Sequence, residues 1–330
     1  MIKATSVTIR QATRASIAAV CLAVSVWAPM ANAATAQSFQ ISPPTSNYSA
    51  NPGATVRGVV KVTNLTDQPI SLAVDKQNFA AKGEEGEVEL IDNADPLYSL
   101  APWFNVLQPN VDVAARATKE VPYSISIPAN AEPGGRYGAL VFHTIAARLP
   151  VGQSGAAVEQ DIVALIFVRI NGAANEQLNV TSFQTGTRVN ADTFNVKDFF
   201  EYGPVDFLAR IKNTGTVHEK ATGTITIKNM LGIQIAKFPL DEHFVIPGSI
   251  RRLHNSWPTG THKPVLFGHY TATMTANYAG GKTITATTSF TVLPWKILVA
   301  VFIILVLIFL IVWRGRKRLS RAARILAGRE

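Results

Sequence analysis

The sequence predicts an all-β protein of two tandem sandwich domains followed by one transmembrane helix. Apolar and polar residues alternate along most of the chain between Gln37 and Leu293, and clusters of Pro, Gly and Asn separate the alternating stretches. A run in which every residue is apolar then extends from Ile297 to Trp313. A chain of 330 residues usually holds two domains, because a single hydrophobic core stops growing before that size.

The strand pattern is clear in several places in the first half of the chain. Val56, Val60 and Val62 share one face of a predicted strand, and the segment from Val121 to Ile127 alternates in the same way. The nearly continuous apolar segment Asp161–Ile170 predicts a strand buried on both faces that closes the first domain. Turn residues such as Asn51-Pro52-Gly53 separate the strands, and Leu97–Phe104 is the segment most typical of a helical turn.

Three short patterns occur twice in the same order, which indicates an internal duplication. They are Val62-Thr63-Asn64, Ile127-Pro128 and Gly135-Arg136-Tyr137 in the first half, and Ile211-Lys212-Asn213, Ile246-Pro247 and Gly268-His269-Tyr270 in the second. Two copies of one immunoglobulin-like sandwich, at residues 37–172 and 176–293 with a junction near Asn171–Gln177, would explain this repetition. A chance coincidence of short patterns is the alternative.

The charge of the chain is concentrated at its two ends. The net charge is +9, of which +3 comes from Lys3, Arg10 and Arg14 and +6 from the segment Arg314–Glu330. The middle of the chain therefore has no net charge and no basic excess to attract a nucleic acid. Positive charge beside apolar segments instead orients a chain in a membrane.

The amino end has the three parts of an export signal. Basic residues are followed by the apolar run Ile17–Trp27 and by Ala31-Asn32-Ala33, which predicts cleavage after Ala33 and a signal peptide at residues 1–33. An uncleaved anchor is the alternative, although the run is too short to span a bilayer. The only cysteine, Cys21, lies in this segment, so the mature chain has neither a disulfide nor a thiol nucleophile.

The carboxyl end has the features of a membrane anchor. Residues 296–313 are long and apolar enough to span a bilayer, and Trp295 and Trp313 are placed for the two interfaces. The basic tail, residues 314–330, predicts a cytoplasmic carboxyl terminus, so the amino terminus lies outside after signal cleavage. The sequence therefore predicts a single-pass protein of the cell membrane with its β domains outside.

Several landmarks resemble those of the WxL-interacting protein family of bacterial surfaces. They are Phe39–Pro44, Asn51-Pro52-Gly53 leading into Val56–Asn64, Pro96–Leu107, and Ile127-Pro128 followed by Pro133-Gly134-Gly135 and Tyr137–Phe142. The resemblance implies an amino-terminal peptidoglycan-binding sandwich, a second sandwich that binds surface partners, one transmembrane helix and a basic tail. It covers most of the chain in layout, and the second half agrees in the order of its elements more than in its residues.

No catalytic pattern is found in the sequence, and no enzyme activity, cofactor or metal ion is predicted. Five of the six histidines lie in the second half, but none are spaced two apart on a strand as a metal site would need. The acidic segment Lys82–Glu87 is predicted to be a solvated hairpin tip, with calcium binding as the alternative.

Aromatic residues are the candidates for ligand binding. Trp103, with Phe104 and Asn105, could stack on a sugar ring and bind its hydroxyls, and Trp257, in a loop-like stretch from His254 to Pro264, is a second candidate. The alternative is that these rings fill the sandwich cores.

These patterns favour a non-enzymatic, membrane-anchored protein of the cell surface that binds cell-wall peptidoglycan or another extracytoplasmic surface protein. A structural or assembly subunit of an envelope complex, holding its partner by strand-edge contacts, is the alternative function. A metal-dependent module in the second domain is a third hypothesis.

Overall fold

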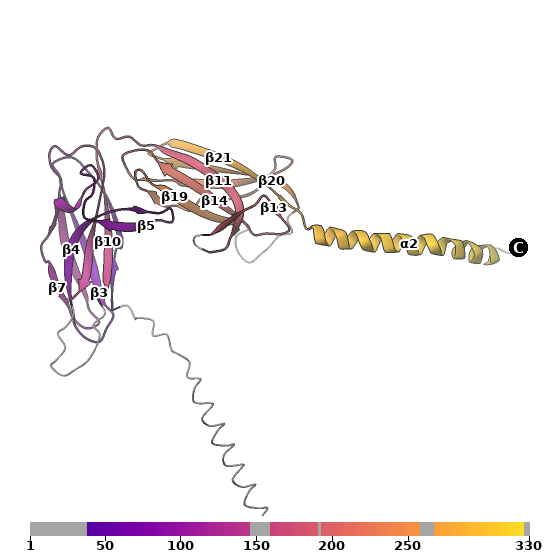
Figure 1. Cartoon of the computed structure of the whole chain (residues 1–330), viewed down its shortest axis with the longest axis horizontal. Helices are drawn as coiled ribbons and strands as arrows, with labels where there is room; N and C mark the ends of the chain where they lie inside the picture. Colours follow the sequence, from indigo (N-terminus) through magenta and orange to yellow (C-terminus); the bar gives the residue numbers. More distant parts are fainter. Residues whose placement is uncertain (1–37, 146–158, 191–192, 258–266, 327–330) are drawn as a thin grey trace, which may run out of the picture. The chain divides into compact units, whose positions relative to one another are not determined.

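The computed structural model describes residues 38–145, 159–190, 193–257 and 267–326, with side chains in the final helix as far as Arg314. Within these residues the chain forms two immunoglobulin-like β-sandwiches followed by one helix (Figure 1), as the sequence predicts. The expected signal peptide, its cleavage site and Cys21 lie outside the described residues, and their assignment stays a prediction.

The first sandwich extends from Phe39 to Ile170. Its elements are β1 (Phe39–Ser42), β2 (Thr45–Ala50), β3 (Thr55–Asn64), β4 (Ile70–Lys82), β5 (Glu87–Ile91), the 3₁₀ turn η1 (Ala101–Trp103), β6 (Phe104–Val106), β7 (Asn110–Val113), β8 (Thr118–Ser126), β9 (Gly134–Thr144) and β10 (Asp161–Ile170). One sheet has the order β1-β3-β8-β6, and the other has the order β2-β10-β9-β4-β5, with β7 also paired to β4. The turn η1 lies in the segment expected to be helical, and β10 has the bounds that its apolar run predicts.

The second sandwich extends from Leu178 to Val292. Its strands are β11 (Leu178–Arg188), β12 (Phe194–Val196), β13 (Phe199–Phe200), β14 (Val205–Asn213), β15 (Glu219–Lys220), β16 (Thr222–Asn229), β17 (Gln234–Pro239), β18 (Phe244–Val245), β19 (Ile250–Trp257), β20 (Gly268–Tyr278) and β21 (Lys282–Val292). Its sheets have the orders β12-β11-β14-β19 and β13-β21-β20-β16-β17, and β15 pairs with β18.

The two sandwiches have the same topology, which supports the internal duplication. The order β1-β3-β8 corresponds to β11-β14-β19, and the order β2-β10-β9-β4-β5 corresponds to β13-β21-β20-β16-β17. In both copies the first strand is divided between the sheets, so that β2 lies parallel to β10 and β13 lies parallel to β21.

A buried asparagine closes the equivalent strand of each copy. Asn64 ends β3 and Asn213 ends β14, and both side chains are almost completely buried. In each case Nδ2 donates to the carbonyl four residues later, at 2.7 Å, while Oδ1 accepts from the backbone N–H two residues later, at 2.8 Å. These bonds satisfy backbone groups where the chain turns away from the sheet. The repeated Asn therefore has the same structural role in both copies.

Each sandwich has its own hydrophobic core between its sheets. Alternate residues of β3 and β8, such as Val60, Val62 and Ile125, point into the first core, as their alternation predicts. The second core contains Phe207, Phe290 and a further set of buried apolar side chains.

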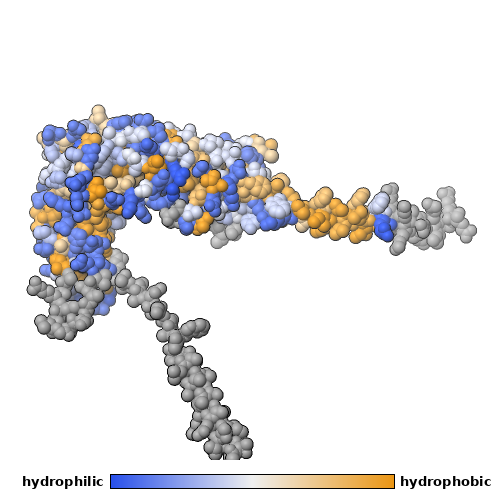
Figure 2. Space-filling view, viewed as in Figure 1, coloured by the Kyte–Doolittle hydropathy of each residue, from blue (hydrophilic) through white to orange (hydrophobic). Residues whose placement is uncertain are grey.

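The helix α2 (Trp295–Leu326) follows β21 after two residues. Its segment Trp295–Arg314 has a mean hydropathy of 3.2, and none of the window is buried by the rest of the chain. Figure 2 shows this apolar surface in orange along the helix. A helix of this length and composition could cross a membrane, and its backbone continues into the predicted basic tail.

Candidate functional site

The aromatic candidates of the first sandwich lie where the 3₁₀ turn η1 leads into β6. Phe104 is 3% exposed and belongs to the first core, whereas Asn105, the next residue of β6, is exposed. Trp103 is half-buried against the same core, and the guanidinium carbon of Arg136 lies 5.4 Å from the centre of its ring. Phe104 therefore offers no face to a ligand, and sugar binding by Trp103 and Asn105 stays a prediction.

Trp257 is a core residue of the second sandwich. It is the last residue of β19 instead of part of a loop, and it is 7% exposed. Its ring centre lies 5.8 Å from that of Tyr270 and 6.3 Å from that of Phe290, in edge-to-face arrangements typical of packed aromatic cores. Trp103 and Trp257 pack in different cores, so the structure does not bring the two candidates together.

The acidic hairpin tip, Lys82–Glu87, contacts the second sandwich, so it is not the solvated turn that the sequence predicts. Glu84 Oε2 accepts hydrogen bonds from Arg210 Nε at 2.7 Å and from Arg252 Nε at 2.6 Å. Glu85 pairs with Arg252 Nη1 at 3.1 Å and with His254 Nε2 at 3.2 Å. Glu84 and Glu85 are therefore paired with basic side chains of β14 and β19.

Electrostatics and packing both favour this seating of the hairpin. Burial by itself would raise the pKa of Glu84, but the hydrogen bonds and charges of Arg210 and Arg252 outweigh it and lower the pKa below its ordinary value. Gly86 has a φ of +88°, and an added Cβ would overlap the guanidinium group of Arg251. This left-handed backbone conformation favours glycine, and a larger residue would also have to displace the Arg251 side chain.

Aromatic rings continue the contact between the sandwiches beside the hairpin. Phe79, Tyr137 and Phe167 form a small cluster on the outer face of the first sandwich. The His218 ring centre lies 5.2 Å from that of Phe167 and 5.6 Å from that of Tyr137, while Phe244 stacks on Phe167 at 5.6 Å. The aromatic rings of this contact therefore lie at distances typical of a hydrophobic core.

His218 is a buried titratable group within that contact. It is 5% exposed, and its Nε2 lies 3.0 Å from Asn47 Oδ1. Burial, followed by the charge of Arg169, lowers the pKa of His218 to about 4. The imidazole is therefore neutral at pH 7, and its role there is structural.

A cavity of about 570 Å³ opens between the acidic hairpin tip and the second sandwich. We call it the hairpin cleft. Its lining is mostly apolar and includes Phe79, Ile91, Tyr98, Ile246, Pro247 and Ile250. Ile91, Tyr98, Ile246 and Ile250 are only partly buried, so they present apolar surface to an occupant. The volume is typical of sites that bind a small ligand or a few side chains of a partner.

Polar groups of the hairpin cleft lie mainly on its hairpin side. The carboxylates of Glu84 and Asp95 both belong to its lining. Glu84 is held by two arginines, and Asp95 Oδ1 accepts a hydrogen bond from the backbone N–H of Leu97 at 2.9 Å. Among the described residues there is no group of three or more His, Cys, Asp or Glu side chains placed to hold a metal ion. The cleft is therefore suited to binding an apolar group near a negative charge.

Local sequence patterns did not reveal the hairpin cleft. Ile246-Pro247 was recognised only as the end of a predicted strand, and Tyr98 only as part of the segment before η1. These residues are about 150 positions apart in the chain, and they lie together because the duplicated sandwiches pack against each other. A pattern within a few residues cannot predict a contact between residues that are so far apart in the sequence.

Comparisons with known proteins give similarities at the level of architecture. No family model and no curated protein match the chain. Similar solved structures include the class 5 fimbriae chaperone CfaA, at 14% identity and a TM-score of 0.39 over 77% of this chain and 100% of that chain. The Salmonella enterica SafA pilin in complex with the SafB chaperone has 10% identity and a TM-score of 0.36, covering 77% and 96% of the two chains. The E. coli chaperone DraB has 11% identity and a TM-score of 0.36, covering 78% and 98%. Similarities this low do not support an inference about what the chain binds.

Proposed function

We propose that this chain is a membrane-anchored, non-enzymatic surface protein that binds another extracytoplasmic protein, and that the hairpin cleft receives apolar side chains of that partner. The observation that carries the proposal is the cleft itself, a mostly apolar cavity of about 570 Å³ whose lining side chains are only partly buried. Covering this apolar surface with a partner would lower the free energy of the system, because it removes the surface from water.

The chemistry of the hairpin cleft favours a particular kind of occupant. Ile91 and Tyr98 line it from the first sandwich, and Ile246 and Ile250 line it from the second. The exposed carboxylate of Asp95 lies among these apolar groups. An aromatic or aliphatic side chain with a basic neighbour would complement both features.

A protein partner fits the described surface better than the peptidoglycan that the family resemblance implies. A sugar site commonly uses an exposed aromatic face with polar groups around it. Here Phe104 and Trp257 are buried, and a cation lies over the Trp103 ring. The proposal therefore keeps the surface-protein partner and treats glycan binding at Trp103 and Asn105 as the competing outcome.

The membrane arrangement belongs to the same proposal. The predicted export signal, the apolar helix α2 and the arginines that follow it support a chain whose sandwiches lie outside the cell membrane and whose carboxyl end is cytoplasmic. Protease added to intact cells should then remove residues between Gln37 and Leu293. Protection of that segment in intact cells would contradict this orientation.

The binding test uses the whole chain with a carboxyl-terminal affinity tag, recovered from chemically cross-linked cell envelopes. We expect a protein partner in stoichiometric amount with the natural chain and a loss of at least about tenfold in Ile91→Asn and Ile250→Asn, because each places an amide in the apolar lining. Leu107→Asn is the matched control, since Leu107 is 67% exposed and lies outside the cleft.

The same preparations distinguish the competing outcomes. Circular dichroism must first show that each variant keeps the fold of the natural chain. Equal recovery of the partner by all three variants would refute the role of the hairpin cleft. Retention of the natural chain on purified wall sacculi, lost in Trp103→Ala and unaffected by Ile250→Asn, would instead establish glycan binding by the first sandwich.

A further inference from the structure

The last strand of the second sandwich, β21, is paired along only one of its edges. β20 pairs with all of β21, from Lys282 to Val292. On the opposite edge β13 pairs only with Thr291 and Val292. Within the part of the chain that the structure describes, no strand pairs with β21 from Lys282 to Phe290 on that edge, although β11 of the facing sheet approaches β21 closely. We call this segment the open edge.

The first sandwich shows what a more complete edge looks like in the same fold. There β2 occupies the position of β13 and pairs with six residues of β10, from Leu165 to Ile170. β13 pairs with two residues of β21, because the chain before it crosses to the other sheet, where Lys197 N donates to Thr185 O at 3.0 Å. The second copy therefore lacks most of the edge strand that its counterpart has.

The backbone groups of the open edge are regularly placed for an added strand. Thr291 N donates to Asp198 O at 2.7 Å and Leu293 N donates to Phe200 O at 2.8 Å, so odd-numbered residues direct their backbone groups to this edge. Because this direction alternates along a strand, the N–H and C=O groups of Thr283, Thr285, Thr287 and Ser289 face the same way. The register of β21 on β20 is continuous, so no bulge interrupts the series.

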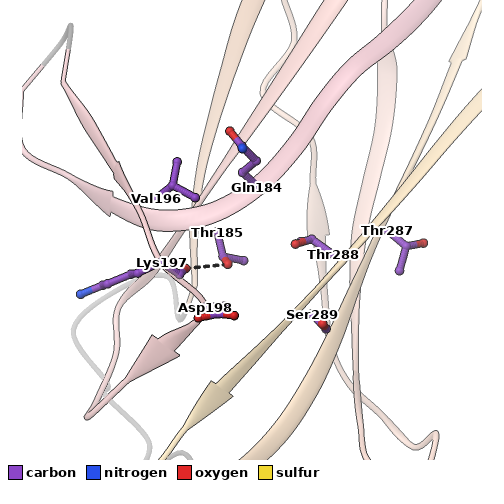
Figure 3. Close-up of a pocket in the computed structure, with 8 residues that line it drawn as sticks. All are labelled: Gln184, Thr185, Val196, Lys197, Asp198, Thr287, Thr288 and Ser289. Carbon is purple, nitrogen blue, oxygen red and sulfur yellow. Dashed lines mark hydrogen bonds between the residues drawn. The ribbon is translucent and has the colours of Figure 1, made fainter.

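A groove lies where an added strand would meet β13. It has a volume of about 620 Å³ and is lined by Gln184, Thr185, Val196, Lys197, Asp198, Thr287, Thr288 and Ser289. Figure 3 shows Thr185 and Asp198 facing Thr288 and Ser289 across it, with the hydrogen bond from Thr185 Oγ1 to Lys197 O, and the Lys197 side chain directed away. The β21 side of the groove therefore carries the small hydroxyl side chains of Thr287, Thr288 and Ser289, and the opposite side carries Thr185 and the carboxylate of Asp198.

Apart from Lys282 at its start, the open edge lacks the usual protection against added strands. Exposed edges normally carry charged residues, prolines or bulges that prevent pairing with other chains. β5 carries Glu87 and Glu89, and β17 carries Lys237 and Pro239. From Thr283 to Val292, β21 contains only Thr, Ser, Ala, Ile, Phe and Val.

We infer that the open edge binds one extended segment of a partner polypeptide, which lies parallel to β21 and continues the line of β13. The pairing of β13 supplies the direction, and the pairing of β2 with β10 supplies the template for the length. Because Thr287, Thr288 and Ser289 are small and uncharged, the side chains that face the groove are expected to be small and uncharged too, such as Ser, Thr, Asn and Ala. A second copy of this chain fits less well, because two β21 strands related by a two-fold axis would run antiparallel. The surface is separate from the hairpin cleft, so this inference does not depend on the proposed function.

The test uses a synthetic peptide with the sequence of β2, Thr45–Ala50, which already serves as the parallel edge strand of the first sandwich. Amide hydrogen exchange is measured on the whole chain in detergent micelles, with and without the peptide. At ten times the dissociation constant, the amides of Thr283, Thr285, Thr287 and Ser289 should exchange about tenfold more slowly. The amides of the residues between them, which already bond to β20, should change little.

Two substitutions at one position make the test specific. Thr287→Pro removes a donor from the open edge and leaves the bonds to β20 in place, so it should abolish the protection. Thr287→Val is the matched control, because it keeps the N–H and should retain the protection. Both variants count as folded if their unfolding temperatures lie within about 2–3 °C of that of the natural chain, which is the size of change expected for a surface substitution.

Three results would overturn the inference. They are equal exchange with and without peptide at millimolar concentration, slow exchange of the four amides before peptide is added, and pairing of two copies of the chain seen as a concentration-dependent dimer. The cleft variants Ile91→Asn and Ile250→Asn should respond to the peptide as the natural chain does. Failure at the open edge is therefore distinguishable from failure at the hairpin cleft.

Discussion

Replacing Asn213 by alanine tests the structural role of the repeated asparagine. Its Nδ2 donates to Val217 O at 2.7 Å and to Val245 O at 2.8 Å, and its Oδ1 accepts from Gly215 N at 2.8 Å. Asn213 is 0% exposed, so water cannot replace these partners in the folded chain. Each hydrogen bond contributes about 1 kcal/mol net, and buried groups left without partners add to the loss. We therefore expect Asn213→Ala to reduce the free energy of unfolding by about 3–4 kcal/mol.

Urea unfolding of the whole chain in detergent micelles, followed by circular dichroism, measures this loss. Because the slope is about 1–3 kcal/mol per molar urea for a domain of this size, the midpoint for the second sandwich should fall by about 1–4 M. Asn179→Ala is the matched control, since Asn179 is exposed and makes one side-chain bond, to Thr214 Oγ1 at 2.9 Å. Its midpoint should change little. Equal shifts in the two variants would refute the argument, and Asn64→Ala should affect the first sandwich instead.

Three further predictions concern the contact between the sandwiches and the second core. The pKa of His218 is about 4 in the folded chain, against an ordinary value of 6.5. As the pH decreases, the unfolded chain therefore takes up the proton first. The free energy of unfolding should fall by about 3 kcal/mol between pH 6.5 and pH 4. This part of the pH dependence should be absent from His218→Gln in urea titrations across that range. Glu84→Gln and Arg252→Lys should show a coupling energy of about 1 kcal/mol in a double-mutant cycle, and strictly additive effects would contradict their pairing. Trp257→Ala should cost about 3–5 kcal/mol in unfolding experiments, and a variant with natural stability but impaired binding would show that the ring is a ligand site.

Local alternation was sufficient to predict most strands, because a strand with one buried face has a period of two residues. Val60 and Val62 point into the core as expected, and the unbroken apolar run Asp161–Ile170 forms β10 with the predicted bounds. The duplicated patterns at Asn64 and Asn213 predict equivalent strand ends, and the two residues do end β3 and β14. In each of these cases the physical cause lies within a few residues of the pattern.

Features that depend on distant residues could not be predicted in this way. The segment Lys82–Glu87 has the composition of a solvated turn, but the arginines that bind it lie more than 120 positions later. Trp257 precedes a proline and a glycine, which indicated a loop, whereas its burial depends on Tyr270 and Phe290. The open edge was likewise hidden, because the Thr-rich pattern of β21 is that of any half-buried strand.

Only Leu293 and Pro294 separate β21 from α2. Two residues extend over at most about 7 Å, so the second sandwich has very little tether with which to move away from the first turn of the helix. In a chain anchored by α2, the open edge, which ends at Phe290, would lie only a few residues along the chain from the lipid headgroups. A polypeptide that docks there would have to approach along the bilayer surface, which favours partners that are themselves membrane-bound over freely diffusing ones.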